Sequence, residues 1–195
     1  MVRVGRNLAA RAGVLAGLAA ALYVIPGCSS KQGADLASLA VGDMKALKVD
    51  AAPTPAPQVT FTDGGGKPHT LADFKGKAVV LNIWGTFCAP CVAEMPTLAK
   101  LETETAGQPL VVLPVSVDTE DDRANAEAFI AKRPPLPFYS DPKYGLAYGV
   151  KPPIEGMPTT LLIDRDGNVR ARLAGGADWS GQDALHVVQA LEKLG

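Results

Sequence analysis

The sequence predicts an α/β domain, and three observations indicate it. Strand-like and helix-like stretches alternate along residues 58–195, which is the pattern of a sheet covered by helices. Two near-continuous apolar runs, 78–84 and 110–117, are rich in β-branched residues, as expected of strands buried on both faces. The composition, 47% hydrophobic against 20% charged, is typical of a globular protein that carries an additional apolar segment.

The additional apolar segment lies at the N-terminus. Three arginines precede an uncharged run over 12–25, and this basic-then-apolar order is that of an export signal. The run is shorter than the roughly 20 residues of a membrane-spanning helix. We therefore expect residues 1–30 to be a signal or membrane anchor that places the rest of the chain outside the cytoplasm, in the periplasm or an equivalent extracytoplasmic space.

Cys28 ends this segment and leaves two interpretations open. The stretch Ile25-Pro26-Gly27-Cys28 is similar to a bacterial lipobox, in which the cysteine becomes the lipid-bearing first residue. Pro26 stands where that motif prefers alanine, serine or threonine. Residues 1–30 are therefore either an uncleaved anchor or the signal of a lipoprotein, and both attach the chain to a membrane through its N-terminus.

Residues 31–57 are expected to connect the anchor to the domain. A mild helical pattern over 31–49 predicts a short amphipathic helix that docks on the domain. Alternating prolines follow over 50–57, and such a sequence favours an extended polyproline conformation. We interpret this second part as a semi-rigid spacer, so that the domain itself occupies 58–195. A solvated tether is the alternative for either part.

The first half of the domain begins with a predicted β-hairpin. Its arms are 58–62 and 67–71, and the glycine-rich turn 63–66 supplies the positive-φ positions that a tight turn needs. The first central strand over 78–84 and a helix over 88–105 follow.

The second half of the domain alternates in the same way. Its predicted elements are a strand over 110–117, a helix over 120–132, a short helix over 144–148, a hairpin of 159–163 with 168–173, and a helix from about Ser180. Ser180 and Asp183 have the spacing of a capping box that would start the last helix.

The charge balance excludes one class of partner. The 19 basic and 20 acidic residues create no positive field that would hold the phosphates of a nucleic acid. We therefore expect no nucleic-acid partner.

The stretch Cys88-Ala89-Pro90-Cys91 carries the predicted chemistry. It lies where the first central strand turns into a helix, and Pro90 falls in the first turn, where its missing N–H costs little. Unpaired N–H groups and the dipole of a helix N-terminus favour the nucleophilic thiolate of Cys88. We expect Cys88 to attack a substrate disulfide, and Cys91, one turn further and more shielded, to resolve the mixed disulfide.

A zinc site or a static disulfide is the structural alternative for a Cys-x-x-Cys pair. A zinc site needs two further ligands with paired spacing. The chain has two histidines, His69 in a hairpin arm and His186 in the last helix, and each lacks a partner. We therefore predict no metal and no cofactor.

Several further motifs stand in thioredoxin order. They are Trp84-Gly85-Thr86-Phe87-Cys88-Ala89-Pro90-Cys91, Pro96, Gly156-Met157-Pro158-Thr159 and the Asp166-Gly167 hairpin. On these residues the chain resembles the TlpA branch of the thioredoxin superfamily, together with its ResA-like and CcmG-like reductases. The resemblance implies a thioredoxin-like fold, a central mixed sheet flanked by helices, here with an added N-terminal β-hairpin. It also implies a membrane-tethered extracytoplasmic reductant that serves cytochrome oxidase or cytochrome c assembly.

The resemblance also assigns supporting roles around the cysteine pair, to Trp84, Pro90, Glu94, Met157 and Pro158. The bond before Pro158 should be cis, which brings the Met157 backbone beside Cys88 to pair with a substrate strand. Glu94 matches a glutamate that ResA-like reductases keep near the pair. It either takes the proton from Cys91 or is a solvated helix residue.

Asn82 stands six residues before the first cysteine, where thioredoxin itself has a buried aspartate. That acid–base group is therefore absent, and a hydrogen bond from Asn82 to the backbone is the expected role. Proton handling then falls to Glu94 or to water.

The direction of electron flow depends on how strongly the Cys88 thiolate is stabilised. Ala89 and Pro90 have no donor side chain. A strong oxidant of this type lies near about −120 mV and thioredoxin near about −270 mV, and we expect the thioredoxin end. The partners are then proteins with disulfides and a DsbD- or CcdA-like membrane thiol transporter that supplies electrons. Two other functions stay open: a copper-binding assembly chaperone, which needs a third ligand near the pair, and a redox-inert protein-binding module.

Overall fold

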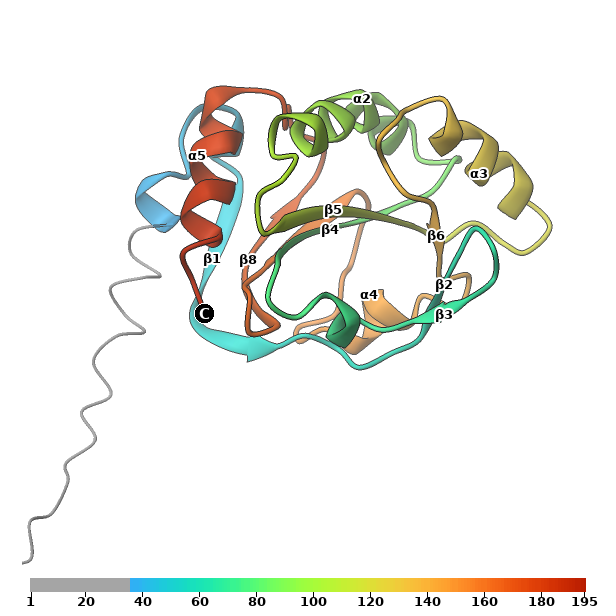
Figure 1. Cartoon of the computed structure of the whole chain (residues 1–195), viewed down its shortest axis with the longest axis horizontal. Helices are drawn as coiled ribbons and strands as arrows, with labels where there is room; N and C mark the ends of the chain where they lie inside the picture. The colour runs from blue at the N-terminus through green and yellow to red at the C-terminus, as the bar shows by residue number, and fades with distance from the viewer. Residues whose placement is uncertain (1–35) are drawn as a thin grey trace, which may run out of the picture.

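The computed structural model describes residues 36–195, whose strands form one eight-stranded sheet (Figure 1). The predicted signal and Cys28 lie outside the described residues. The strands follow the order β1-β8-β7-β4-β5-β6-β2-β3 across the sheet. Their bounds are β1 Leu47–Pro55, β2 Phe61–Asp63, β3 Pro68–His69, β4 Ala78–Trp84, β5 Leu110–Ser116, β6 Tyr139–Ser140, β7 Thr159–Ile163 and β8 Asn168–Ala174.

Helices cover both faces of the sheet. They are the 3₁₀ turns η1 Gly42–Met44 and η2 Leu71–Phe74, and the α-helices α2 Ala89–Glu104, α3 Arg123–Ala131, α4 Gly145–Gly149 and α5 Gln182–Leu191. Helices α2 and α3 lie on the side of the sheet opposite to α4 (Figure 1). One buried apolar cluster lies under α2, α3 and α5, and a second lies between the sheet and α4 with η2. None of the helices within 36–195 has both the length and the apolar character needed to cross a bilayer.

The register of β4 determines which side chains reach helix α2. All of β4 is buried, and it pairs in parallel with β5 and antiparallel with β7. Side chains alternate between the two faces of a strand. Val80 and Trp84 belong to the cluster under α2, so Asn82 between them faces α2 as well.

The predicted architecture is confirmed. Parallel and antiparallel pairs coexist in the sheet, helices flank it, and β2 pairs with β3 as the predicted hairpin. The helices and strands predicted within 58–195 are present with ends that differ by a few residues.

The interpretation of the proline-rich segment as a spacer is wrong for 50–55. This stretch belongs to β1, which pairs antiparallel with β8 from Leu47↔Leu173 to Pro55↔Asn168. β1 covers the backbone groups that β8 would otherwise expose at the sheet edge, and an edge strand tolerates prolines that lack an N–H. The residues before it dock on the domain as predicted, because Leu36 and Met44 are buried in the cluster beside α5. The predicted helix does not extend to 49, since within 36–49 the chain forms a helical turn at 36–38, the 3₁₀ turn η1 and, from Leu47, strand β1.

The predicted capping box at Ser180 is also wrong. Helix α5 has Gly181 at its N-cap and no side-chain cap. The Ser180 hydroxyl instead donates to Asp178 at 2.6 Å in the loop before the helix. Asp178 in the loop accepts the Ser180 hydroxyl that a capping box would use. The spacing of Ser180 and Asp183 alone does not reveal this competing hydrogen bond.

Candidate active site

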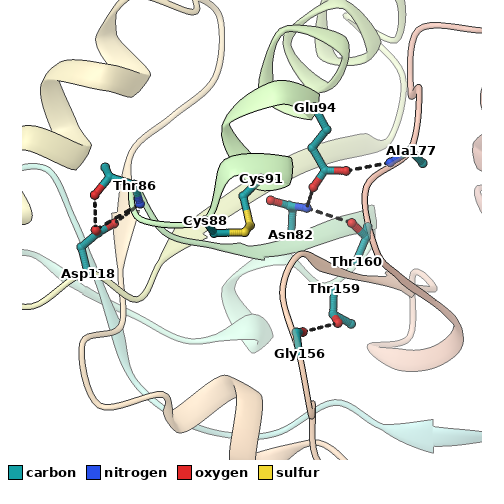
Figure 2. Close-up of a disulfide and its surroundings, with 10 residues drawn as sticks. All are labelled: Asn82, Thr86, Cys88, Cys91, Glu94, Asp118, Gly156, Thr159, Thr160 and Ala177. Atoms are coloured by element: carbon teal, nitrogen blue, oxygen red, sulfur yellow. Dashed lines mark hydrogen bonds between the residues drawn. A yellow bond between two sulfur atoms is a disulfide. The ribbon is translucent and has the colours of Figure 1, made fainter.

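The cysteine pair lies at the N-terminus of α2 and forms a disulfide in this structure (Figure 2). Cys88 is the N-cap residue and its carbonyl accepts the first helical hydrogen bond, from Val92. Cys91 is in the first turn, and the two Cα atoms are 5.3 Å apart. Cys91 is completely buried, whereas Cys88 is partly exposed. A partner can therefore reach Cys88 and cannot reach Cys91 without first reacting there.

At the start of α2, the helix N-terminus itself is the main feature that can stabilise an anionic Cys88 sulfur. Cys88 has no side-chain cap, Ala89 and Pro90 are exposed, and Pro90 stands in the first turn. The N–H groups of a first turn have no partner within the helix, and they carry the positive end of its dipole. This arrangement favours a thiolate once the disulfide is reduced.

Asp118 holds the chain that leads into Cys88. Its carboxylate accepts from the Thr86 backbone N–H at 3.0 Å, from the Ser116 hydroxyl at 2.7 Å and from the Thr86 hydroxyl. Asp118 lies two residues after the end of β5, and Ser116 is in register with Trp84, so the adjacent ends of β4 and β5 bring the loop and the aspartate together (Figure 2). Sequence reasoning missed Asp118, although a polar residue directly after the apolar run 110–117 is a usable signal.

Replacing Asp118 with alanine is expected to destabilise the protein by about 2–4 kcal/mol, because several donors lose a buried acceptor together. Urea unfolding followed by tryptophan fluorescence measures the change. Asp121→Ala, at an exposed aspartate of the same loop, is the matched control and should stay within about 0.5 kcal/mol of the parent. A decrease in unfolding free energy of less than about 1 kcal/mol for Asp118→Ala would contradict the role of Asp118 in holding the loop before Cys88.

Glu94 and Asn82 form a buried polar network behind Cys91. The Asn82 side-chain N–H₂ donates to Glu94 Oε1 and to Thr160 Oγ1, both at 2.9 Å. The Ala177 backbone N–H donates to Glu94 Oε2 at 3.1 Å. Figure 2 shows the Asn82 and Glu94 side chains pointing toward one another. Cys91 and Glu94 are three residues apart on α2, the spacing of neighbouring side chains on a helix.

This network corrects two expectations. Glu94 is only 4% exposed, so its interpretation as a solvated residue is wrong. Asn82 donates to two side chains and does not serve the backbone as expected, because β4 directs it toward α2 and β7. Thr160 and Ala177, which complete the network from distant parts of the chain, carry no signal in the sequence.

Burial raises the pKa of Glu94 from its ordinary value of 4.5, and the hydrogen bonds from Asn82 and Ala177 lower it in part. An acid whose pKa is higher in the folded state stabilises the fold fully below its unfolded pKa and loses that contribution as pH rises through the folded pKa. At neutral pH the ionised Glu94 therefore lowers the free energy of unfolding, compared with the protonated acid.

The difference in unfolding free energy between Glu94→Gln and the parent should accordingly shift in favour of the variant as pH rises from about 4 to 7. Denaturant unfolding of both proteins across that range measures it, and all other titrating groups cancel in the difference. A difference that is independent of pH would show that Glu94 titrates normally.

The loop before β7 contains two of the predicted supporting residues, Met157 and Pro158. The Met157–Pro158 peptide bond is cis, as the resemblance implies. Pro158 is buried, and Met157 packs against the same apolar cluster as Cys88. The Thr159 hydroxyl donates to the Gly156 carbonyl at 2.7 Å and fixes the end of the loop, which Figure 2 shows below the disulfide.

Trp84 lies inside the core. It is completely buried, and its ring packs on Phe129 with centroids 5.3 Å apart. Its position under α2 supports the helix from below, and it is not part of the exposed surface around Cys88.

Neither histidine lies with the cysteine pair. His69 lies 3.0 Å from Asp63 and 3.3 Å from Asp73 in the hairpin region, and His186 is exposed on α5. Within residues 36–195, no group of three or more His, Cys, Asp or Glu side chains is arranged to hold a metal ion.

A partly exposed and a buried cysteine at the start of the helix that follows the first central strand define a thiol-disulfide oxidoreductase. Residues 51–188 match the model of the Redoxin family, and the chain belongs to that family.

Individual relatives agree with this class. The chain is 36% identical over 123 residues to the thiol-disulfide oxidoreductase ResA of Geobacillus thermodenitrificans, a match that covers 62% of this chain and 67% of that protein. The structure is similar to that of a putative thiol:disulfide interchange protein DsbE from Chlorobium tepidum, with 27% identity, a TM-score of 0.61, and coverage of 74% of this chain and 99% of that one. It is also similar to the exposed lipoprotein thioredoxin Etrx1 of Streptococcus pneumoniae, with 26% identity, a TM-score of 0.56, and coverage of 70% and 98%. The predicted resemblance and the predicted enzyme class are both confirmed.

Proposed function

We propose that this protein is a membrane-tethered extracytoplasmic reductant of disulfides in partner proteins. The observation that carries the proposal is the asymmetry of the pair: Cys88 is partly exposed at a helix N-terminus, and Cys91 is fully buried behind it. With no donor side chain at Ala89 or Pro90, only the helix N-terminus stabilises the thiolate, which favours a reducing pair over an oxidising one.

The reaction proceeds by two exchanges. The Cys88 thiolate attacks one sulfur of the partner's disulfide, that S–S bond breaks, and the other sulfur leaves as a thiolate. Cys91 then gives its proton to Glu94 and attacks the Cys88 sulfur. The mixed disulfide breaks, the second partner sulfur leaves as a thiolate, and the Cys88–Cys91 disulfide forms. Two electrons pass to the partner, whose thiolates take up protons from Glu94 and water.

The other predicted residues support these steps. Trp84 and Pro90 set the position of the first turn of α2, and the Met157 backbone beside Pro158 is the proposed pairing site for the partner's strand. Asn82 holds the Glu94 carboxylate in place for the proton transfer.

The location rests on the N-terminal segment. Residues 1–30 have the composition of an export signal, and Cys28 stands at the end of a lipobox-like stretch. The similarity to a lipoprotein thioredoxin supports attachment through Cys28. Lipid attached at Cys28 and an uncleaved anchor both keep the domain at the membrane surface.

The reaction requires a supply of electrons and a substrate. Each turnover leaves a disulfide, so a membrane thiol transporter of the DsbD or CcdA kind is the proposed donor. The resemblance to TlpA-, ResA- and CcmG-like reductases implies partner proteins of cytochrome c or cytochrome oxidase assembly, and these are the proposed substrates.

The reduction potential of the Cys88–Cys91 pair tests the direction of electron flow. We expect a value nearer about −270 mV than −180 mV, measured by equilibration with glutathione or dithiothreitol buffers. A value more oxidising than about −180 mV would remove the assignment as a reductase.

A further inference from the structure

Arg172 on β8 joins three parts of the chain that are distant in sequence. Its Nη1 donates to the Pro152 carbonyl at 3.0 Å, and its Nη2 donates to the Lys151 carbonyl at 3.0 Å. Nη2 also lies 3.2 Å from Asp50 Oδ2 on β1. The two side chains are 15% and 22% exposed, so the ion pair is largely shielded from solvent. Charge-assisted bonds from a guanidinium to two carbonyls hold a backbone segment in a defined orientation.

The segment that Arg172 holds leads directly to Met157 and Pro158. It leaves α4 at Val150 and is exposed at most positions up to Gly156. Residues 151–157 all belong to the described part of the chain. Within that part, their backbone makes one hydrogen bond to other backbone groups, from Ile154 N–H to the Ala147 carbonyl at 2.9 Å. The position of this loop therefore depends on side chains: Arg172 at its start and Thr159 at its end.

Strand β1 completes the attachment. A cleft of about 400 Å³ separates the loop from the edge of the sheet, lined among others by Lys48, Pro152 and Ile154, and Asp50 and Arg172 bridge it. Without the carboxylate of Asp50, the guanidinium has no fixed partner on the β1 side.

We infer that Arg172, oriented by Asp50, is a positioning residue for partner binding. By holding the Lys151 and Pro152 carbonyls it places the Met157–Pro158 turn where a partner's strand can pair with it. The inference rests on the proposed function, in which that turn binds the partner. The inference gives strand β1 a role in partner recognition. It predicts that loss of Arg172 impairs reduction of a protein disulfide and leaves reduction of a small disulfide nearly unchanged.

The test compares a protein disulfide with a small one, using purified full-length protein. Arg172→Met should raise KM for insulin about tenfold, equivalent to about 1.4 kcal/mol of binding, with kcat within about twofold. Reduction of the small aromatic disulfide DTNB, which needs no loop, should stay within about twofold of the parent. Asp50→Asn should raise KM for insulin by a smaller factor, about threefold, because the arginine keeps its carbonyl contacts.

Two further variants separate positioning from a general loss of structure. Arg165→Met removes an arginine that donates to the Gly76 carbonyl at the opposite end of the β7–β8 hairpin, and it should leave both assays unchanged. Arg172→Lys retains the charge without the two-armed geometry and should recover KM only in part.

The inference is overturned if Arg172→Met leaves KM for insulin within about twofold of the parent, or if DTNB and insulin reduction fall equally. The proposed function fails in a different way: the parent protein would then not reduce insulin at all, or Cys88→Ser would reduce it equally well.

Discussion

A Cys91→Ser variant is expected to stop after the first exchange and to accumulate as a mixed disulfide between Cys88 and its partner. The buried residue at position 91 is placed to attack the Cys88 sulfur, and a serine hydroxyl cannot do so. Turnover should fall about a thousandfold or more. Cys88→Ser should lose the same activity without any covalent partner at the site, because Cys91, the other thiol of the pair, is shielded from solvent.

Mass spectrometry after acid quenching measures the trapped species, and non-reducing gels of whole cells identify the partner. Cys28→Ser is the matched control, since it removes the third thiol of the chain and should retain turnover in purified protein. Equal trapping by Cys88→Ser and Cys91→Ser would contradict the assigned order of attack.

Glu94→Gln is expected to slow release of the partner about a hundredfold, because the acceptor for the Cys91 proton is lost while the first attack is retained. The Glu94 carboxylate acts as a base only when ionised. Since its pKa is raised by burial, the rate of the parent should fall as pH drops through that raised pKa. The ratio of parent to variant should therefore be largest above this pKa and should shrink toward acidic pH.

Single-turnover kinetics from pH 4 to 9 separate the first exchange from release. Glu104→Gln, at the exposed end of the same helix, is the control and should have no effect on either step. Loss of the first exchange and of release by the same factor would show that Glu94 supports the structure of the site and does not handle the proton.

The local parts of the fold and site could be predicted from the sequence, because each depends on a short pattern. The all-buried strand β4 follows from its continuous apolar run, and the placement of Cys88 and Cys91 follows from a Cys-x-x-Cys at a strand-to-helix turn. The resemblance added the cis bond at Pro158, which no local propensity specifies.

The non-local contacts could not be predicted in this way. Prolines in 50–57 favour an extended chain, and an extended chain suits an edge strand as well as a spacer, so only the pairing of β1 with β8 decides between them. The surroundings of Glu94 come from β4, β7 and the loop at Ala177, which lie up to 83 residues away from it along the chain. Contacts at that separation leave no periodic signal in a single sequence.

The central claim is that the start of α2 presents an accessible, anionic Cys88 with Cys91 withheld behind it. The most direct test is alkylation of the reduced protein with iodoacetamide at pH 7, with the modified peptides assigned by mass spectrometry. The account predicts that Cys88 reacts several times faster than a free cysteine and that Cys91 stays unmodified until the protein is unfolded. A Cys88 that reacts no faster than a free cysteine, or a Cys91 that reacts first, would contradict it.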